Sequence, residues 1–295
     1  MAARTGSGSG SGSGSRPRSR SRSRRRRPRH GTSDLFARIL IAVPAIAFAV
    51  FIIVSGDWIF TAGAVLLGLL CMHEFFRMYE GLRPVKLAGF AALIGLGVAA
   101  QLGDERQVLL AAVAFVPVLF LLGVAMPARE DVTITAGLAI TTFGVFWIGM
   151  AIAHAVLLRG TPHGDGIIID ILVGTFIGDT GAYLGGRSFG TRRLAPRISP
   201  NKTLEGLAIG FVTAVLATWC AGLYQDWLSG GNALLLGVAV GLAAPLGDLF
   251  ESQVKRDSGV KDTGKAFGAH GGALDRLDAA FFTLVAGYYV WLALL

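Results

Sequence analysis

The sequence has little charge and almost no cysteine. Charged residues make up 16% of its 295 positions and hydrophobic residues 53%, whereas roughly a quarter of the residues of an ordinary soluble domain are charged. This shortage excludes an ordinary soluble domain. The two cysteines, Cys71 and Cys220, lie far apart in apolar stretches. Neither a disulfide framework nor a zinc site is therefore expected, and both thiols are predicted to be small buried side chains.

The first 30 residues contain no acidic side chain. They hold ten of the 27 lysines and arginines, in a Gly/Ser alternation followed by an Arg/Ser/Pro run, and this composition cannot bury enough apolar surface to fold. The remaining chain has 17 basic and 19 acidic residues, a net charge of −2. We predict a disordered cytoplasmic arm over residues 1–33, close to anionic headgroups of membrane lipids. RNA binding by the Arg/Ser run is the less favoured interpretation, and no nucleic acid is expected as a partner.

Long apolar runs, in contrast, are abundant. A bilayer core near 30 Å takes about 20 helical residues to cross, so these runs predict an all-α, polytopic integral membrane protein with about nine transmembrane helices. Glycine is frequent inside the runs, which permits close approach of membrane helices. The run at 86–102 is the weakest. The predicted spans lie at about residues 35–54, 58–76, 86–102, 107–126, 132–158, 166–186, 204–226, 232–250 and 277–295.

Basic residues in the predicted loops set the orientation. With the N-terminus in the cytoplasm, 14 lysines and arginines after Arg38 fall in cytoplasmic loops and two, Arg106 and Arg159, fall outside. The sequence thus predicts a protein of the bacterial inner (plasma) membrane, with its C-terminus outside. We expect residues 34–164 to form a scaffold of membrane helices and residues 165–295 to form a catalytic membrane domain with two cytoplasmic active-site loops.

Several acidic residues lie within the apolar runs of the second half. An ionised carboxylate at mid-depth in a bilayer costs about 2.5–3.5 kcal/mol on insertion scales, so Asp179 and Asp248 are expected to face a polar cavity or a cation. If the helix that contains Asp248 continues past Phe250, four polar residues share one of its faces at spacings of three, four and seven: Asp248, Glu251, Ser252 and Lys255. Asp275 and Asp278 share a face in the same way.

Carboxylates in this pattern suit Mg²⁺, which usually binds through one or two carboxylates plus substrate phosphates. The alternative is that the acids and bases only neutralise each other at the membrane edge. In the preceding loop, Ser199 is predicted to cap a helix that begins at Pro200. Lys202 and Arg187 near that helix start predict an anion site. Metal-binding carboxylates, phosphate-binding cations and a lipid environment together indicate phosphoryl or nucleotidyl transfer onto a lipid phosphate.

Three runs of residues carry a family resemblance. The longest is Ser252-x-Val254-Lys255-Arg256, followed by Lys261-Asp262-x-Gly264, Phe267-Gly268-x-His270-Gly271-Gly272 and Asp275-Arg276-Leu277-Asp278. The others are Ser199-Pro200-Asn201-Lys202-Thr203-x-Glu205-Gly206 and Asp179-Thr180-Gly181-Ala182-Tyr183. These runs resemble the motifs of phosphatidate cytidylyltransferases, also called CDP-diacylglycerol synthases. Ala273 and Thr191 depart from the family pattern, which has a bulkier aliphatic residue and a lysine there.

The resemblance implies transfer of the cytidylyl group of CTP to phosphatidate, with Mg²⁺ as cofactor and room for a second cation. It implies metal binding by Asp248, Asp275 and Asp278. The implied catalytic residues are Asp248, Lys255, Arg256, Lys261, Asp262, His270, Asp275, Arg276 and Asp278. The implied substrate-binding residues are Asp179, Arg187, Ser199, Asn201, Lys202, Glu205, Ser252, Gly271 and Gly272.

CTP, phosphatidate and membrane lipids are the expected partners, and a homodimer is a further expectation. Two other functions stay open from the sequence. One is a related CTP-dependent membrane enzyme that acts on another lipid phosphate or on a polyprenol. The other is a cation-coupled transporter in which Asp179 and Asp248 line the ion pathway. A transporter would keep polar residues on both sides of the membrane midplane, whereas here they gather on the cytoplasmic side.

Overall fold

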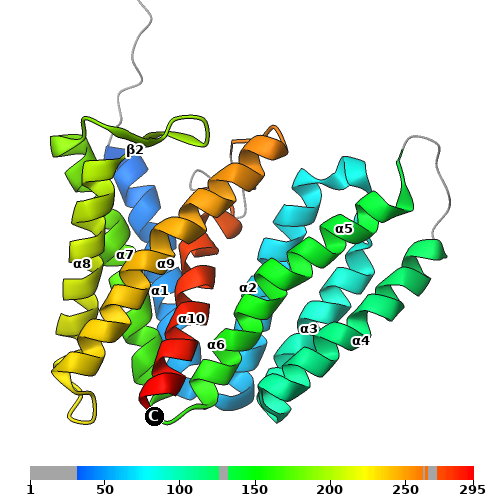
Figure 1. The fold of residues 1–295 in the computed structure, drawn as a ribbon, viewed down its shortest axis with the longest axis horizontal. Helices are drawn as coiled ribbons and strands as arrows, with labels where there is room; N and C mark the ends of the chain where they lie inside the picture. The colour runs from blue at the N-terminus through cyan, green and yellow to red at the C-terminus, as the bar shows by residue number, and fades with distance from the viewer. Residues whose placement is uncertain (1–31, 126–131, 262, 265–270) are drawn as a thin grey trace, which may run out of the picture.

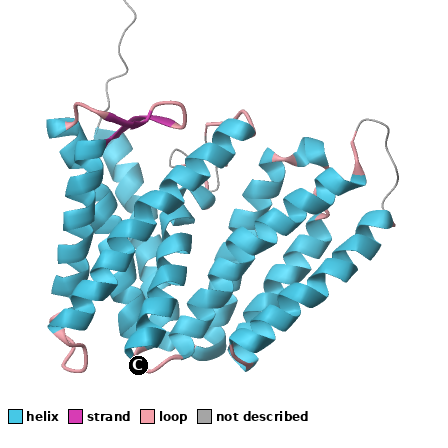
Figure 2. Ribbon diagram, in the orientation of Figure 1, coloured by secondary structure: helices cyan, strands magenta, loops and turns pink. Residues whose placement is uncertain are grey.

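The computed structural model describes residues 32–125, 132–261, 263–264 and 271–295, with side chains described from Val43 onward. Almost all of this chain is helical, and Figure 2 shows a single two-stranded hairpin at one end. The helices are α1 (Thr32–Ser55), α2 (Asp57–Met78), the short turn η1 (Glu80–Leu82), α3 (Lys86–Leu102), α4 (Glu105–Val124), α5 (Ile134–Gly144), the π-helical segment η2 (Val145–Gly149), α6 (Met150–Gly160), α7 (Gly164–Phe189), α8 (Leu204–Gly222), α9 (Gly230–Asp257) and α10 (Leu274–Leu294).

Seven helical runs in the described chain are long and apolar enough to cross a membrane. They are α2, α4, the continuous run α5–η2–α6, α7, α8, α9 and α10. Val43–Ser55 and Lys86–Leu102 are shorter apolar helices; at 1.5 Å per residue, the 17 residues of α3 extend about 26 Å. The all-α, polytopic membrane architecture is confirmed, and the count of nine spans is not.

Large apolar side chains cover the outward faces of these helices. On α4, Leu109, Val116 and Phe120 are more than half exposed. Soluble monomers rarely expose apolar patches of this extent, so these faces suit contact with lipid.

The helices α7 and α8 pack closely because glycine and alanine meet along their interface. A Cβ atom placed on Gly178 would lie 2.8 Å from the Cβ of Ala214, and one placed on Gly210 would lie 2.6 Å from the Cβ of Ala182. The helices α8, α9 and α10 continue the layer, and α10 also contacts α6 and α2 (Figure 1). The second half of the chain is therefore joined to the first through α10.

Strands β1 (Arg193–Ala195) and β2 (Ser199–Thr203) connect α7 to α8 as an antiparallel hairpin. The expected helix start at Ser199 and Pro200 is wrong, because both residues belong to β2. The backbone N–H of Leu204 donates to the carbonyl of Arg192 at 2.9 Å, which keeps the segment extended as far as Thr203. Thr203 is the N-cap instead, and its hydroxyl accepts from the N–H of Gly206 at 3.1 Å.

The two cysteines differ in their surroundings. Cys71 is fully buried in the core, as expected. Cys220 is exposed, so that part of the prediction is wrong. It follows Val212 and Leu216 at intervals of four residues on the outward face of α8, where both of those side chains are about half exposed.

Candidate active site

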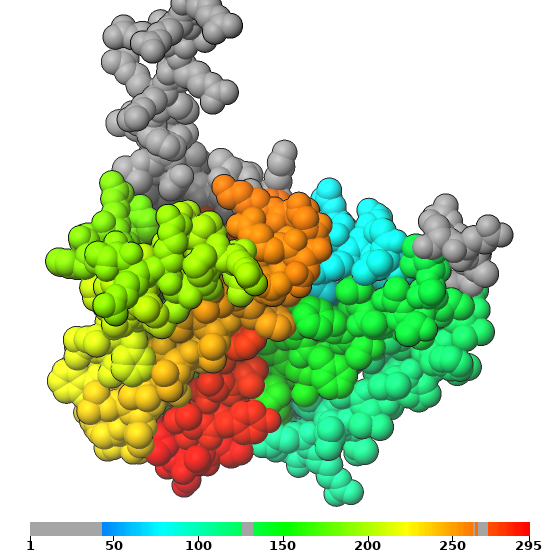
Figure 3. Space-filling view, turned by 45° about the horizontal axis from the view of Figure 1, so that its top comes forward, coloured from blue at the N-terminus to red at the C-terminus, as the bar shows by residue number. Residues whose placement is uncertain are grey.

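Most charged residues of the second half gather at one end of the helices. The hairpin, the C-terminal end of α9 and the N-terminal end of α10 lie at this end, opposite the C-terminus (Figure 1). Figure 3 brings this end forward and shows the hairpin in yellow-green beside the end of α9 in orange, with the residues around η1 in cyan beyond it. All the loops predicted to be cytoplasmic in the described second half therefore share one end.

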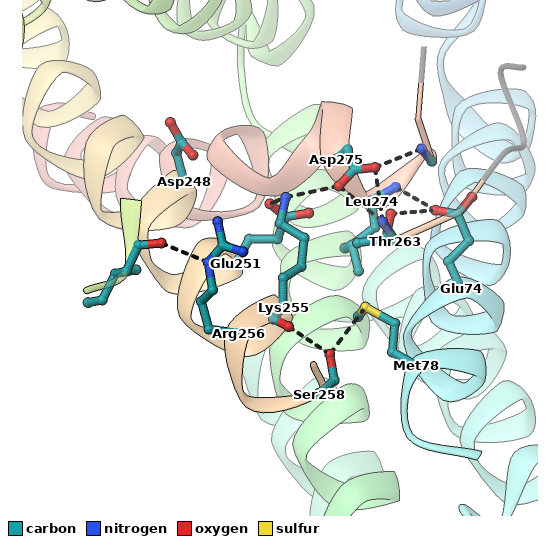
Figure 4. Close-up of polar contacts among 12 residues, drawn as sticks. Glu74, Met78, Asp248, Glu251, Lys255, Arg256, Ser258, Thr263, Leu274 and Asp275 are labelled. Carbon is teal, nitrogen blue, oxygen red and sulfur yellow. Dashed lines mark hydrogen bonds and ion pairs between the residues drawn. The ribbon is translucent and has the colours of Figure 1, made fainter. Parts of the chain in front are cut away.

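Lys255 connects α9 to α10 at the centre of the site. Its Nζ lies 2.5 Å from Oε2 of Glu251, one helical turn earlier, and 3.0 Å from Oδ1 of Asp275 (Figure 4). The Glu251 side chain is 1% exposed and that of Lys255 is 16% exposed. Breaking a buried ion pair by removing one partner leaves an uncompensated charge, so each of these three side chains depends on the other two. The predicted shared face of Glu251 and Lys255 is confirmed, because α9 extends to Asp257.

Asp275 is held by backbone donors as well as by Lys255. It accepts from the N–H of Gly272 at 2.8 Å and from the N–H of Thr263 at 3.2 Å. Gly271 has a φ of +85°, and a Cβ atom there would lie 2.7 Å from Oδ2 of Asp275. A side chain at Gly271 would therefore be strained and would collide with the carboxylate. The two glycines predicted to bind substrate lie within the loop that surrounds Asp275.

Asp248 belongs to a second, neighbouring group of charges. Its Oδ2 forms an ion pair with Nζ of Lys202, which reaches it from strand β2. A Cβ atom on Gly247 would lie 2.6 Å from the carbonyl oxygen of Asp278 and 3.0 Å from Cα of Ala279, so α9 and α10 cross closely here. The carboxylates of Asp278, Asp248 and Asp179 are within electrostatic range of one another. This group therefore brings three acidic side chains close together.

Asp248 and Asp275 are not hydrogen-bonded to a common partner in the described chain. Asp248 pairs with Lys202. Asp275 pairs with Lys255, as Figure 4 shows. The site thus consists of two adjacent carboxylate–lysine groups, with Asp278 at 8% exposure on the α10 side of the helix crossing. Both aspartates lie at the same end of the helices.

Besides the pair of Lys202 with Asp248, Glu205 and Arg256 fix the hairpin segment to the helices. The Glu205 carboxylate accepts from the hydroxyl of Thr191 at 2.6 Å and from the N–H groups of Thr191 and Arg192 at 3.1 and 3.2 Å. Arg256 donates through Nε to the carbonyl of Ile198 at 3.1 Å. Threonine at position 191, where the family pattern has lysine, therefore supplies a donor to Glu205. Glu205 and Arg256 make contacts that hold the hairpin over the end of α9.

The other predicted residues lie around this centre. Arg187 is exposed and donates to the hydroxyl of Tyr183 at 3.2 Å. Ser199 and Asn201 lie in β2, and Ser252 is half-buried on α9. Lys261 and Arg276 have exposed side chains next to the loop that contains Gly271. Asp262 and His270 lie outside the described residues.

Three residues at the site, Glu251, Glu74 and Tyr79, were given no catalytic, metal-binding or substrate-binding role from the sequence. Glu251 stood on the predicted polar face, but spacing alone could not show that it pairs with Lys255 and lies fully inside. Glu74 is an acid within an apolar run of the half predicted to be scaffold. In the structure its Oε2 accepts from the N–H of Leu274 at 3.0 Å, across 200 residues of sequence. Tyr79, after the end of α2, also reaches the site, since its hydroxyl donates to the carbonyl of Val254 at 3.0 Å. Burial raises the pKa of Tyr79.

The described residues contain no group of three or more His, Cys, Asp or Glu side chains placed to hold a metal ion by themselves. Mg²⁺ usually takes only one or two protein carboxylates and completes its shell with phosphates and water. Oε1 of Glu251 is buried and has no hydrogen-bond partner in this part of the chain. The lysines beside Asp248 and Asp275 mark positions where positive charge is stabilised. The carboxylates of the site therefore fit a Mg²⁺ ion whose remaining ligands are water and oxygens of the substrate phosphates.

The fold and the site define a membrane-embedded protein with a carboxylate–lysine centre at one end of its helices. Comparison with known proteins places it further: the chain belongs to the cytidylyltransferase family, whose profile matches residues 36–294. It is 30% identical to the phosphatidate cytidylyltransferase of Synechocystis sp., over 88% of this chain and 97% of that protein. It is 32% identical to the phosphatidate cytidylyltransferase of Bacillus subtilis, over 87% of this chain and 97% of that protein.

A further relative matches over a shorter range. The chain is 37% identical to an uncharacterized protein of Escherichia coli, over 52% of this chain, and it spans 55% of that relative's length. The resemblance found in the sequence motifs is confirmed by the family match, and so is the enzyme class, a CTP-dependent nucleotidyltransferase.

Proposed function

We propose that this enzyme transfers the cytidylyl group of CTP to phosphatidate, giving CDP-diacylglycerol and pyrophosphate, at the end of α9 and α10. The observation that carries the proposal is the junction of the two helices, where Lys255 lies between Glu251 and Asp275 while Lys202 pairs with Asp248. Lys202, Lys255 and Asp275 belong to the runs that resemble the family motifs, and Asp248 and Glu251 lie just before the longest of these runs. Two relatives that match over nearly their full length are named for this activity.

The reaction needs no nucleophile from the protein. A phosphate oxygen of phosphatidate forms a bond to the α-phosphorus of CTP, and the bond from that phosphorus to the oxygen bridging the β-phosphate breaks. The electron pair of the broken bond leaves with pyrophosphate. In such phosphoryl-type transfers the protein contributes positioning and stabilisation of charge on the phosphate oxygens.

Lys202 and Lys255 are placed to position the phosphates and to stabilise the charge on their oxygens. The triphosphate of CTP competes with Asp248 for Lys202 and with Asp275 for Lys255, so binding exchanges a carboxylate–lysine pair for a phosphate–lysine pair. Arg256, Lys261 and Arg276 add positive charge around the same end. When bound, Mg²⁺ neutralises charge on the phosphates, and Asp248, Asp275 and Asp278 are the residues that would hold it.

We infer that this end faces the cytoplasm of the bacterial inner membrane. CTP is a charged, water-soluble substrate, and the basic loop residues favour this orientation by 14 to two. The basic arm then lies on the same side, near anionic headgroups. Assembly as a homodimer stays a prediction.

The direct test is transfer of label from CTP to phosphatidate by the purified protein in detergent. We expect product from the natural chain and loss of turnover by at least about a hundredfold in Asp275→Asn, because a neutral amide cannot balance Lys255 or a cation. Asp226→Asn, an exposed aspartate in the turn between α8 and α9, is the matched control and should keep full activity. Full turnover in Asp275→Asn would contradict the proposed active site. Absence of product from the natural chain would contradict the proposed function.

A further inference from the structure

Glu74 is a buried acid that the mechanism above does not use. It lies on α2, in the half of the chain expected to be only scaffold, and it is 5% exposed. Burying a carboxylate costs several kcal/mol unless it is paired and hydrogen-bonded. Its position therefore calls for partners that stabilise the charge, and these partners lie in the active-site loop.

The partners come from both sides of the loop that precedes α10. Oε2 of Glu74 accepts from the backbone N–H of Leu274 at 3.0 Å and from the hydroxyl of Thr263 at 3.3 Å (Figure 4). Leu274 is the first residue of α10, so its N–H is one of the helix-start donors that need an acceptor from outside the helix. Glu74 thus acts as the acceptor for the start of α10.

Two glycines let the loop backbone lie directly on this carboxylate. A Cβ atom on Gly272 would lie 2.2 Å from Oε2 of Glu74, and one on Gly264 would lie 2.4 Å from Oε1. Neither glycine has a positive φ, so close approach rather than backbone conformation explains them. Gly264 and Gly272 therefore leave the space that the Glu74 carboxylate occupies.

The same loop residues hold Asp275 on their other side. Thr263 donates its hydroxyl to Glu74 and its N–H to Asp275, and the N–H of Gly272 donates to Asp275 at 2.8 Å. Thr263 and Gly272 are therefore held between two carboxylates, one from α2 and one from α10. Movement of the loop away from Glu74 would change the position of Asp275 and, through it, of Lys255.

We propose that Glu74 is a positioning residue for cytidylyl transfer: it anchors the loop and the start of α10 from α2, so that Asp275 and Lys255 are held in place for the substrate phosphates. The inference rests on the proposed function for its effect on turnover. Its effect on the loop does not depend on that function. Misplacement of catalytic groups by about 1 Å can lower turnover on the order of a hundredfold.

The test compares Glu74→Ala, Glu74→Gln and Met72→Ala in steady-state kinetics with CTP and phosphatidate. Met72 is equally buried on α2 but packs against Gly144 rather than the loop, so it reports the cost of loosening α2 alone. We expect Glu74→Ala to lower kcat at least tenfold. Glu74→Gln keeps an acceptor for Leu274 and should restore most of that loss. Met72→Ala should lower thermal stability but leave kcat within about twofold.

Amide hydrogen exchange of the same variants provides a readout that needs no reaction. In Glu74→Ala, exchange at the N–H groups of Thr263, Gly272 and Leu274 should rise by at least tenfold, and in Met72→Ala it should not. Unchanged exchange at these groups in Glu74→Ala, or an unchanged kcat, would overturn the proposal. If the natural chain lacked transfer activity, the proposed function would fail, while hydrogen exchange would still decide whether Glu74 anchors the loop.

Discussion

At the scale of single residues, Lys255 links the two helices that meet at the centre of the site. Its ammonium group pairs with Glu251 on its own helix and with Asp275 on the next. Two carboxylates therefore share a single cation in a region largely closed to water. The pairing also explains how an acid as deeply buried as Glu251 is tolerated inside a membrane protein.

We predict that Lys255→Met destabilises the protein and abolishes turnover. Removing one partner of a buried pair costs about 3–5 kcal/mol, and turnover should fall by at least about a hundredfold because the triphosphate loses a cation. Thermal unfolding in detergent and the CTP transfer assay measure the two effects. Lys86→Met is the control, since Lys86 forms an exposed pair with Glu80 at the same end of the molecule and should change neither quantity much. Normal turnover in Lys255→Met would be incompatible with the role given to this lysine.

At the scale of elements, the site depends on how closely α7, α8, α9 and α10 pack. The α7–α8 contact is made through small residues, and the hairpin that joins these helices carries Lys202 to Asp248. A change in the spacing of α7 and α8 would therefore shift Lys202 relative to α9. The predicted division into scaffold and catalytic halves stays a prediction, but α2 reaches the site through Glu74 and Tyr79.

We expect Gly210→Leu to separate α7 from α8. A Cβ atom at this position already lies 2.6 Å from the Cβ of Ala182 and 3.1 Å from the carbonyl oxygen of Gly178, and overpacking of this kind costs typically 1–3 kcal/mol. The midpoint of thermal unfolding should fall, and so should transfer activity. Gly95→Leu on α3, where a Cβ atom would meet nothing within 4 Å, should be tolerated. Equal stability of the two variants would contradict the close packing.

At the scale of the whole molecule, the membrane class and the polar face of α9 could be predicted from the sequence. So could the placement of Asp275 and Asp278 three residues apart on one helix. These features depend on hydropathy and on helical spacing, which are local properties. Spacing could not reveal the strand β2 (Ser199–Thr203), because its extended form depends on pairing with β1, which follows α7. It could not find the role of Glu74 either, since the partners of Glu74 lie about 200 residues further along the chain. The structure adds the contacts between segments that are far apart in the sequence, which local patterns do not reveal.

The central claim is that CTP binds where α9 and α10 meet, and a structure of the protein in lipid nanodiscs with CTP and Mg²⁺ tests it most directly. The account predicts the triphosphate within hydrogen-bond distance of Lys202 and Lys255, with Asp248 and Asp275 turned toward Mg²⁺ instead of their lysines. A nucleotide bound at the other end of the helices, with both lysine–aspartate pairs intact, would contradict it.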